Sequence, residues 1–367
     1  MNRVFLLIIA ATAFVSCTKT TENIIWEKSF GQGRALFIQT TGDTGIVSCG
    51  ESDGKQYLLF LDAEKNTVLE YKSGNKGLFN DAWTGENYFI TAGSTGGKMS
   101  LAKIDNTGTL VWDSVFNTSF RIDNTSLCYL GGGEFLAVGS VNPDSLYAGL
   151  PGLSFVWFDY NGNITQRKDS VYTSYIAVMD AVTDNTGNIY LATSRQNGPS
   201  TMASVAKYTS YLYKQWEKPV SNNQAYGAAS FSIILDGPDK PVIAGRTEIQ
   251  VSSGKEDNTF VARYFFSLPK DSIRKEYLEY ANSGTAIIKD GTGQYLVLNS
   301  RCNIINILDQ NFEPAGIIRT YSSCDSQETD IFGYSIAIDP SGNILIGGVK
   351  GGGYYIALKS STALSPV

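Results

Sequence analysis

Histidine is absent from the 367 residues of this chain. Its absence excludes Ser-His-Asp and Cys-His nucleophile activation and every metal site built on imidazole ligands. It also removes the side chain that most often serves as a general base near neutral pH. No pair of acidic residues stands out from those expected in turns or on the surface. We therefore assign no catalytic residue, no metal site and no cofactor from the sequence.

Charge is scarce as well. Only 17% of the residues are charged, the formal net charge is -6, and no stripe of Lys and Arg is visible. Because binding to nucleic acid requires clustered positive charge, we exclude nucleic acid as a partner. Two Gly-rich runs, 131–133 and 351–353, are expected in turns between strands. No helix follows them, so they are not phosphate-binding loops.

The first residues have the layout of an export signal. Residues 1–17 read MNRVFLLIIAATAFVSC, with one Arg, an apolar core and small residues before a cysteine. The apolar core is too short to span a bilayer. The end of this segment resembles a bacterial lipobox, which predicts that Cys17 is lipidated, that 18–23 is a tether and that 24–367 is a single domain. The alternative is an ordinary cleaved signal peptide with an incidental cysteine.

Four further cysteines remain, and none of them belongs to a Cys-x-x-Cys pair. Cys49 and Cys128 fall in different repeats and are expected to be buried strand residues. Cys302 and Cys324 belong to the same repeat, and an exported chain can oxidise such a pair to a disulfide. The sequence leaves open whether they pair.

A unit of four short strands recurs along the chain. Residues 78–116 show three runs of alternating apolar and polar residues, preceded by a shorter run and separated by Gly-rich or Asn-Thr-Gly turns. This pattern predicts four strands joined by tight turns. A unit of about 40 residues cannot bury both faces alone, so it has to repeat. The repeats are expected at about 35–73, 78–116, 125–172, 176–220, 229–279, 285–321 and from 334 onwards.

The last repeat lacks a fourth strand, and the chain begins with a spare one. Residues 23–30 (NIIWEKSF) resemble the closing strands at 109–116 (TLVWDSVF) and 213–220 (YKQWEKPV). A ring of sheets protects its strand edges only when it closes, and an N-terminal strand can complete the last sheet. The sequence therefore predicts an all-β fold, a seven-bladed β-propeller of four-stranded blades with the ring closed by the N-terminal strand.

Three Asp-rich segments are expected to join first and second strands: 184–188 (DNTGN), 290–293 (DGTG) and 339–343 (DPSGN). In such turns the Asp or Asn side chain bonds to nearby backbone, and Gly supplies a positive φ. A calcium site is the functional alternative for the same residues.

The repeats resemble a known group of proteins. Trp26, Lys28 and the following Phe-Gly pair, a strand that ends in Ala-Gly, and the Lys-x-Asp-x-x-Gly-x-x-x-Trp pattern of 103–112 are similar to the β-propeller repeats of Bacteroidetes-type secreted lipoproteins. More distantly they resemble the propeller repeats of quinoproteins. The resemblance implies a fold and an envelope location rather than an activity.

A set of cations marks the candidate site. The second strands of repeats four to seven end near Arg195, Arg246, Arg301 and Lys350, on the face where propellers carry their second-to-third turns. Aromatic residues, among them Tyr226 and Tyr334, precede first strands on the same face. Arginine forks beside aromatic rings suit carboxylate or sulfate groups. The alternative is that the cations are solvated rim charges and that the aromatics pack between blades.

These observations favour a non-catalytic binding or scaffold lipoprotein of the bacterial envelope. Its partner would be an anionic glycan, a peptide or an envelope protein, and the chain is expected to be a monomer. The tether lacks an acidic run that would resemble a surface-export signal, which favours the periplasmic side of the outer membrane. The alternative function is a carboxylate-dependent glycosidase or lyase that acts on glycans.

Overall fold

The computed structural model describes most of the predicted domain as strands and turns. The part of the chain that it describes contains no helix, and so none long and apolar enough to cross a membrane. The described residues are 24–42, 45–140, 151–171, 176–197, 200–220, 225–251, 254–265, 272–278, 284–300, 304–318 and 331–360.

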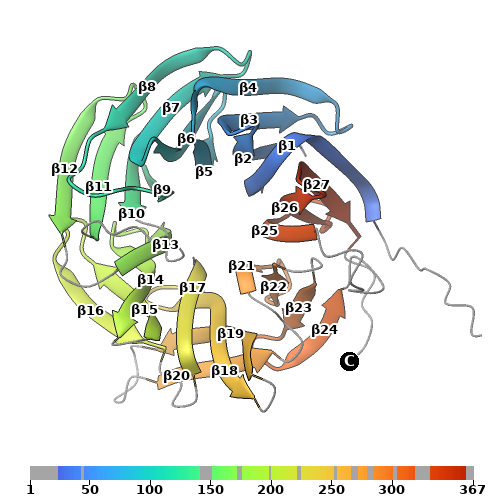
Figure 1. Ribbon diagram of the computed structural model, residues 1–367. Helices are drawn as coiled ribbons and strands as arrows, with labels where there is room; N and C mark the ends of the chain where they lie inside the picture. The colour runs from blue at the N-terminus through green and yellow to red at the C-terminus, as the bar shows by residue number, and fades with distance from the viewer. Residues whose placement is uncertain are drawn as a thin grey trace, which may run out of the picture.

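Five four-stranded antiparallel sheets follow one another around a centre (Figure 1). In each of them sequence neighbours pair, and the strand that comes first in the chain lies innermost. The sheets are β5 (Leu78–Thr84), β6 (Tyr88–Thr95), β7 (Lys98–Asp105), β8 (Leu110–Phe116); β9 (Asn124–Gly131), β10 (Glu134–Ser140), β11 (Gly152–Asp159), β12 (Ile164–Val171); β13 (Ile176–Thr183), β14 (Ile189–Asn197), β15 (Ser200–Tyr208), β16 (Lys214–Pro219); β17 (Ala225–Leu235), β18 (Pro241–Val251), β19 (Gly254–Phe265), β20 (Ser272–Leu278); and β21 (Gly284–Lys289), β22 (Tyr295–Asn299), β23 (Ile305–Leu308), β24 (Pro314–Ile318).

The sixth sheet has seven strands and joins the two ends of the described chain. It contains β25 (Ile331–Ile338), β26 (Ile344–Lys350), β27 (Gly353–Lys359), β1 (Ile24–Thr40), β2 (Ile46–Ser52), β3 (Lys55–Leu61) and β4 (Thr67–Lys76), in that order. The first half of β1 pairs with β27, from Ile24 opposite Lys359 to Gln32 opposite Gly353. Its second half pairs with β2. The pairing of the first strand with the last confirms the predicted closure.

The structure corrects one boundary. The sequence suggested a closing strand that ends at Phe30 and a separate first strand from about Ala35, whereas β1 runs without a break from Ile24 to Thr40. Gly31 and Gly33, with φ of 63° and 140°, let the backbone turn from one sheet into the next without leaving strand pairing. Residues with a side chain rarely adopt these backbone φ angles, which is why glycine occupies both positions.

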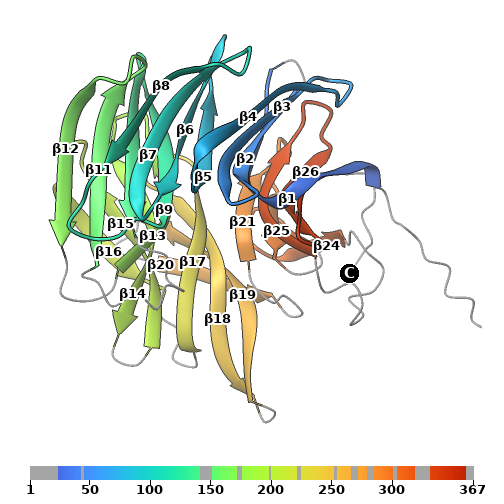
Figure 2. The ribbon, with the colours of Figure 1, turned by 45° about the horizontal axis from the view of Figure 1, so that its top comes forward.

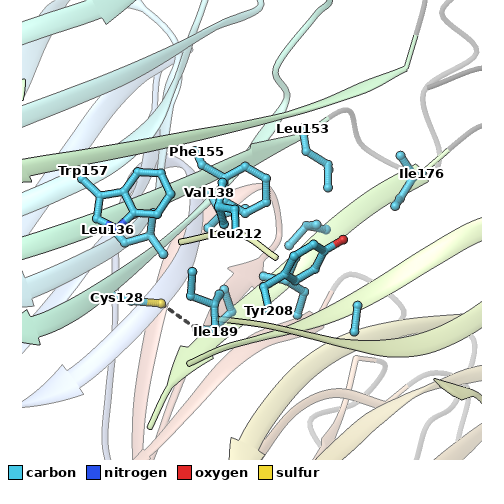
Figure 3. Close-up of a cluster of buried hydrophobic side chains, with 14 residues drawn as sticks. Cys128, Leu136, Val138, Leu153, Phe155, Trp157, Ile176, Ile189, Tyr208 and Leu212 are labelled. Atoms are coloured by element: carbon cyan, nitrogen blue, oxygen red, sulfur yellow. Dashed lines mark hydrogen bonds between the residues drawn. The ribbon is translucent and has the colours of Figure 1, made fainter. Parts of the chain in front are cut away.

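The middle strands of the sheets are buried on both faces, so the core lies between neighbouring sheets. Figure 2 shows these sheets side by side around the centre. Figure 3 shows the cluster between the β9–β12 and β13–β16 sheets, where Phe155 packs against Tyr208 and Trp157 stacks on Phe155. The thiol of Cys128 donates a hydrogen bond of 3.3 Å to the carbonyl of Ala181 in the neighbouring sheet. Cys49 is buried too, so both cysteines are the buried strand residues that the sequence predicted.

A repeated glycine explains the Ala-Gly pattern of the second strands. A Cβ added at Gly50, Gly93, Gly245 or Gly348 would lie 2.0 to 2.1 Å from a carbonyl oxygen of the neighbouring first strand. In each case the first strand has a register shift directly after the residue paired with that glycine. Such β-bulges bend a strand and re-aim its side chains. Because the bulges lie in the innermost strands, they determine which side chains of these strands face the centre of the ring.

The Asp-rich segments form turns. The Asp184 carboxylate accepts hydrogen bonds of 2.9 Å from the backbone N–H groups of Thr186 and Asn188. Asp290 and Asp339 make the same pair of bonds in their own turns. The carboxylate oxygens thus hold the loop itself, which is the role that the turn interpretation assigned to them.

Candidate functional site

The face that carries the second-to-third strand turns is hollowed by a cavity of about 660 Å³. We call this face the upper face and the cavity the basic groove, defined by its charged residues Arg34, Glu51, Lys76, Arg121 and Asp123. They come from β1, β2, β4 and the segment before β9. With Leu78 of β5 and Ser94 of β6, the lining extends from the seven-stranded sheet across the β5–β8 sheet to the start of the β9–β12 sheet. Glu51 precedes the turn between β2 and β3, Lys76 ends β4, and Arg34 follows the bend at Gly31 and Gly33 within β1.

Three cations face two carboxylates in this groove. The Arg34 Nε lies 3.3 Å from Glu51 Oε2, and Arg121 pairs with Asp123. The ammonium of Lys76 makes no ion pair with any residue that the structure describes, and it is exposed. The groove therefore carries an excess of positive charge although the chain is acidic.

The two ion pairs of the groove differ in how open they are to exchange. The side chains of Arg34 and Arg121 are each 43% exposed, and their partners Glu51 and Asp123 are 28% and 14% exposed. Exposed pairs stabilise a fold by about 1 kcal/mol or less. The other oxygen of Asp123, Oδ2, is buried and accepts no hydrogen bond from the described residues, so loss of Arg121 would leave a mostly buried carboxylate without its cation. A ligand anion can therefore compete for Arg34 at less cost to the fold than for Arg121.

Glycine forms part of the groove wall. Gly54 and Gly96 have φ of 73° and 56°, and a Cβ at either position would meet no atom within 4 Å. The turns thus present bare backbone towards solvent, which lets a ligand approach closely.

Two of the cations predicted from the sequence are held inside their own sheets. Arg195 Nη1 lies 2.9 Å from both carboxylate oxygens of Glu217, which is on β16. Lys350 Nζ lies 2.8 Å from Oε1 of Glu27 on β1, which completes the last sheet. Both glutamates follow a closing Trp in a shared Trp-Glu-Lys sequence, and this was the signal that sequence reasoning passed over.

The other predicted residues do not gather in one described pocket. Arg246 lies over the ring of Phe231, with 5.8 Å from its guanidinium carbon to the ring centre. Tyr334 lines the central cavity described below. The lining of the basic groove contains none of the predicted site residues. Cys17, Arg301, Cys302 and Cys324, and the side chain of Tyr226, lie outside the described residues.

The second cavity lies at the centre of the ring and measures about 270 Å³. Its wall is formed by the innermost strands β1, β5, β9, β13, β17, β21 and β25. Polar side chains of one strand accept backbone N–H bonds from the next, as Asp81 does from Leu127 at 2.8 Å and Asp180 does from Ile233 at 2.9 Å. These hydrogen bonds connect the innermost strands of different sheets around the centre.

The carboxyl groups of Asp81 and Asp180 in this wall have raised pKa values. Burial raises the pKa of Asp81 to about 7, against the opposing effect of its backbone hydrogen bonds, and the nearby Asp180 adds to the rise. Burial likewise raises the pKa of Asp180 to about 6. Perturbed acids that line a cavity are candidates for function. Sequence reasoning overlooked both, although each precedes an alanine at the same place in its first strand.

Comparison with known proteins supports the fold. A model for a β-propeller repeat matches residues 326–349. No curated protein matches the chain. Among solved structures, the WD40 domain of Neurospora crassa Pan2 is 12% identical, with a TM-score of 0.59 and coverage of 93% of this chain and 98% of that one. The WD40 β-propeller domain of Doa1 is 10% identical, with a TM-score of 0.59 and coverage of 93% and 97%.

A third neighbour comes from Bacteroides. The extracellular domain of a Bacteroides thetaiotaomicron protein assigned to the hybrid two-component systems is 13% identical, with a TM-score of 0.56. The match covers 92% of this chain and 40% of that one. At these identities the likeness concerns the fold alone. The chain therefore has a β-propeller fold, as its resemblance to β-propeller repeats implied.

Proposed function

We propose that this protein is a non-catalytic binding lipoprotein of the bacterial envelope that holds an anionic ligand on its upper face. The observation that carries the proposal is the basic groove, where three cations meet two carboxylates in a chain of net charge -6. Positive charge concentrated in one hollow of an acidic protein draws anions to that place. The ligand would be an anionic glycan, a peptide or an envelope protein with carboxylate or sulfate groups.

The proposed architecture is a seven-bladed propeller. The seven-stranded sheet then comprises two blades that share β1, one ending with its first half and the next beginning with its second half. The central cavity supports this division, since seven innermost strands contribute to its wall. A rigid ring of this kind holds the groove in place before any ligand arrives.

The cations predicted from the sequence belong to the proposal as a second part of the binding face. Arg195, Arg246, Arg301 and Lys350 would extend the positive surface around the ring, with Tyr226 and Tyr334 beside them. A ligand would have to displace Glu217 and Glu27 from their cations to use it. The basic groove needs no such displacement at Lys76, so we expect it to contribute more to affinity.

Binding arrays test the proposal. The soluble domain from Thr18 onwards is screened on glycan and peptide arrays at low and at high salt, and binding to acidic ligands should weaken as salt rises. On a ligand so identified, Lys76→Glu and Arg121→Glu should each reduce affinity about tenfold or more. Lys168→Glu, the same charge change on the exposed outer strand β12, is the matched control and should change affinity little. Equal effects at Lys76 and Lys168 would remove the groove from the proposal.

A separate experiment tests the remaining cations and the anchor. Replacing Arg195, Arg246 and Lys350 together by Ala should weaken binding less than Lys76→Glu does. Lipidation at Cys17 predicts incorporation of labelled fatty acid and recovery with the outer membrane on the periplasmic side. A Cys17→Ala protein that remains in the membrane fraction and takes up the label would contradict the anchor.

One observation favours a second candidate, a carboxylate-dependent glycosidase or lyase. Asp81 and Asp180 both line the central cavity, on either side of Ser126, and their pKa values of about 7 and about 6 suit an acid and a base. The cavity of about 270 Å³ is small for a sugar chain. Release of reducing ends from envelope glycans, lost in Asp180→Asn, would establish this activity. If the protein leaves the glycans uncleaved, the hydrolase candidate is excluded and the proposed binding function remains.

A further inference from the structure

Three polar side chains from three successive sheets meet in the wall of the central cavity. The hydroxyl oxygen of Ser126 on β9 lies 3.4 Å from Oδ2 of Asp81 on β5 and 3.3 Å from Oδ1 of Asp180 on β13. The same oxygen accepts a hydrogen bond of 3.1 Å from the backbone N–H of Ala181. One serine therefore stands between two carboxyl groups, within reach of both.

If both acids are ionised, the hydroxyl group of Ser126 has too few hydrogens to form a hydrogen bond with each of them. A serine hydroxyl carries one hydrogen and can donate it to only one acceptor. With two carboxylates, the second contact would bring two oxygens together without a proton between them. If one acid is protonated, it donates to Ser126, and Ser126 donates to the other acid. Every contact around the serine then becomes a hydrogen bond.

We propose that Asp81 and Asp180 share a single proton through Ser126, so that the central cavity holds one protonated and one ionised carboxyl group. The proton transfer is balanced, because the hydroxyl receives one proton from the first acid as it gives its own to the second. The unit links the β5–β8, β9–β12 and β13–β16 sheets. This goes beyond ligand binding at the basic groove and does not depend on it.

The remaining contacts of the two acids leave no other source for the missing proton. Asp81 Oδ1 accepts from the N–H of Ala82, and Asp180 Oδ1 accepts from the N–H of Ala181, both at 2.8 Å. Ser232, on the next sheet, contacts the other oxygen of Asp180 at 3.2 Å. No Lys or Arg among the described residues pairs with either acid.

Two buried thiols near the acids are neutral. Cys49 on β2 and Cys128 on β9 are buried, and burial together with the charge of Asp81 raises the pKa of both thiols. Asp180 contributes to the same rise at Cys128. Tyr334 on β25 lines the cavity. Burial is the main cause of the raised pKa values of the two acids, and the charge of Asp180 adds to the rise at Asp81.

Infrared difference spectroscopy of the soluble domain from Thr18 onwards tests the proposal directly. A protonated carboxyl group has a carbonyl stretch that ionised carboxylates lack. Ordinary Asp and Glu are ionised at about pH 7, so the wild-type protein should show this band for about one group, and it should disappear as the pH rises past about 8. Absence of the band from the folded wild-type protein at about pH 7 would overturn the proposal without any variant.

Variants distinguish a proton that the two acids share from protonation of one acid that is caused by burial alone. Asp81→Asn and Asp180→Asn should each move the titration midpoint of the band to lower pH, because burial still raises the pKa of the remaining acid but a second carboxylate no longer faces it. Asp113→Asn, a change at an exposed residue of β8, should keep the wild-type midpoint. An unchanged midpoint in both cavity variants would mean that burial alone protonates one acid. In Ser126→Ala the titration midpoint of the band should shift, and an unchanged midpoint would exclude the serine from the unit.

Discussion

The closing contact between β1 and β27 predicts a sharp difference between two adjacent residues. Trp26 and Phe30 pack against the buried cluster that contains Tyr354 and Leu358, whereas Ile25, which directly precedes Trp26, points outwards and is 55% exposed. Replacing a fully buried Trp by Ala costs about 3 to 5 kcal/mol. Trp26 is only partly buried, so we expect Trp26→Ala to lower the free energy of unfolding by about 2 kcal/mol.

Ile25→Ala is the matched control, since it removes an apolar side chain from the same strand without leaving a cavity. It should change the free energy of unfolding by about 0.5 kcal/mol or less. Denaturant unfolding measures both values. Amide hydrogen exchange then shows where the damage lies, since Trp26→Ala should expose the N–H groups of β27 before those of other strands. Equal stability of the two variants, with β27 protection intact, would refute the closure argument.

Three further predictions concern stability. The folded-state pKa of Asp81 lies above its ordinary 3.8, so the folded protein binds more protons than the unfolded chain. The free energy of unfolding should therefore fall by up to about 4 kcal/mol as the pH rises from about 4 to about 7, an effect reduced in Asp81→Asn but not in Asp113→Asn. Gly50→Ala should cost about 2 kcal/mol or more, because its Cβ would lie 2.0 Å from a carbonyl oxygen, whereas Gly74→Ala has open space and should cost little in the same denaturation assay. Glu217→Gln should cost about 1 kcal/mol in thermal unfolding by removing the partner of a half-buried arginine, and an unaltered melting temperature would contradict that role.

The sheets could be predicted because their signals are local. Alternation of apolar and polar residues fixes which side of a strand is buried, and the Asp-Asn-Thr-Gly turns fix where strands end. Closure could be predicted as well, since Trp26, Trp112 and Trp216 mark equivalent strands along the chain. The continuity of β1 could not, because Gly31 and Gly33 read as a strand break in sequence while their positive φ angles carry the strand onward.

The site was harder to predict because its contacts join strands that are not neighbours. The cation at Arg195 was visible in sequence, but its partner Glu217 is two strands away in the same sheet. Asp81 and Asp180 occupy equivalent positions about a hundred residues apart, and their shared contact with Ser126 exists only because successive sheets converge on one centre. The number of sheets that face the cavity, and so its polarity, depends on the whole ring.

The seam between β1 and β27 has a consequence for how the protein is made. Glu27 and Lys350, which bond across it, are 323 positions apart in the chain. The first half of β1 must therefore wait, without a paired strand, until β27 has been synthesised. During that interval Trp26 and Phe30 offer an unprotected apolar strand to any other chain with a free edge.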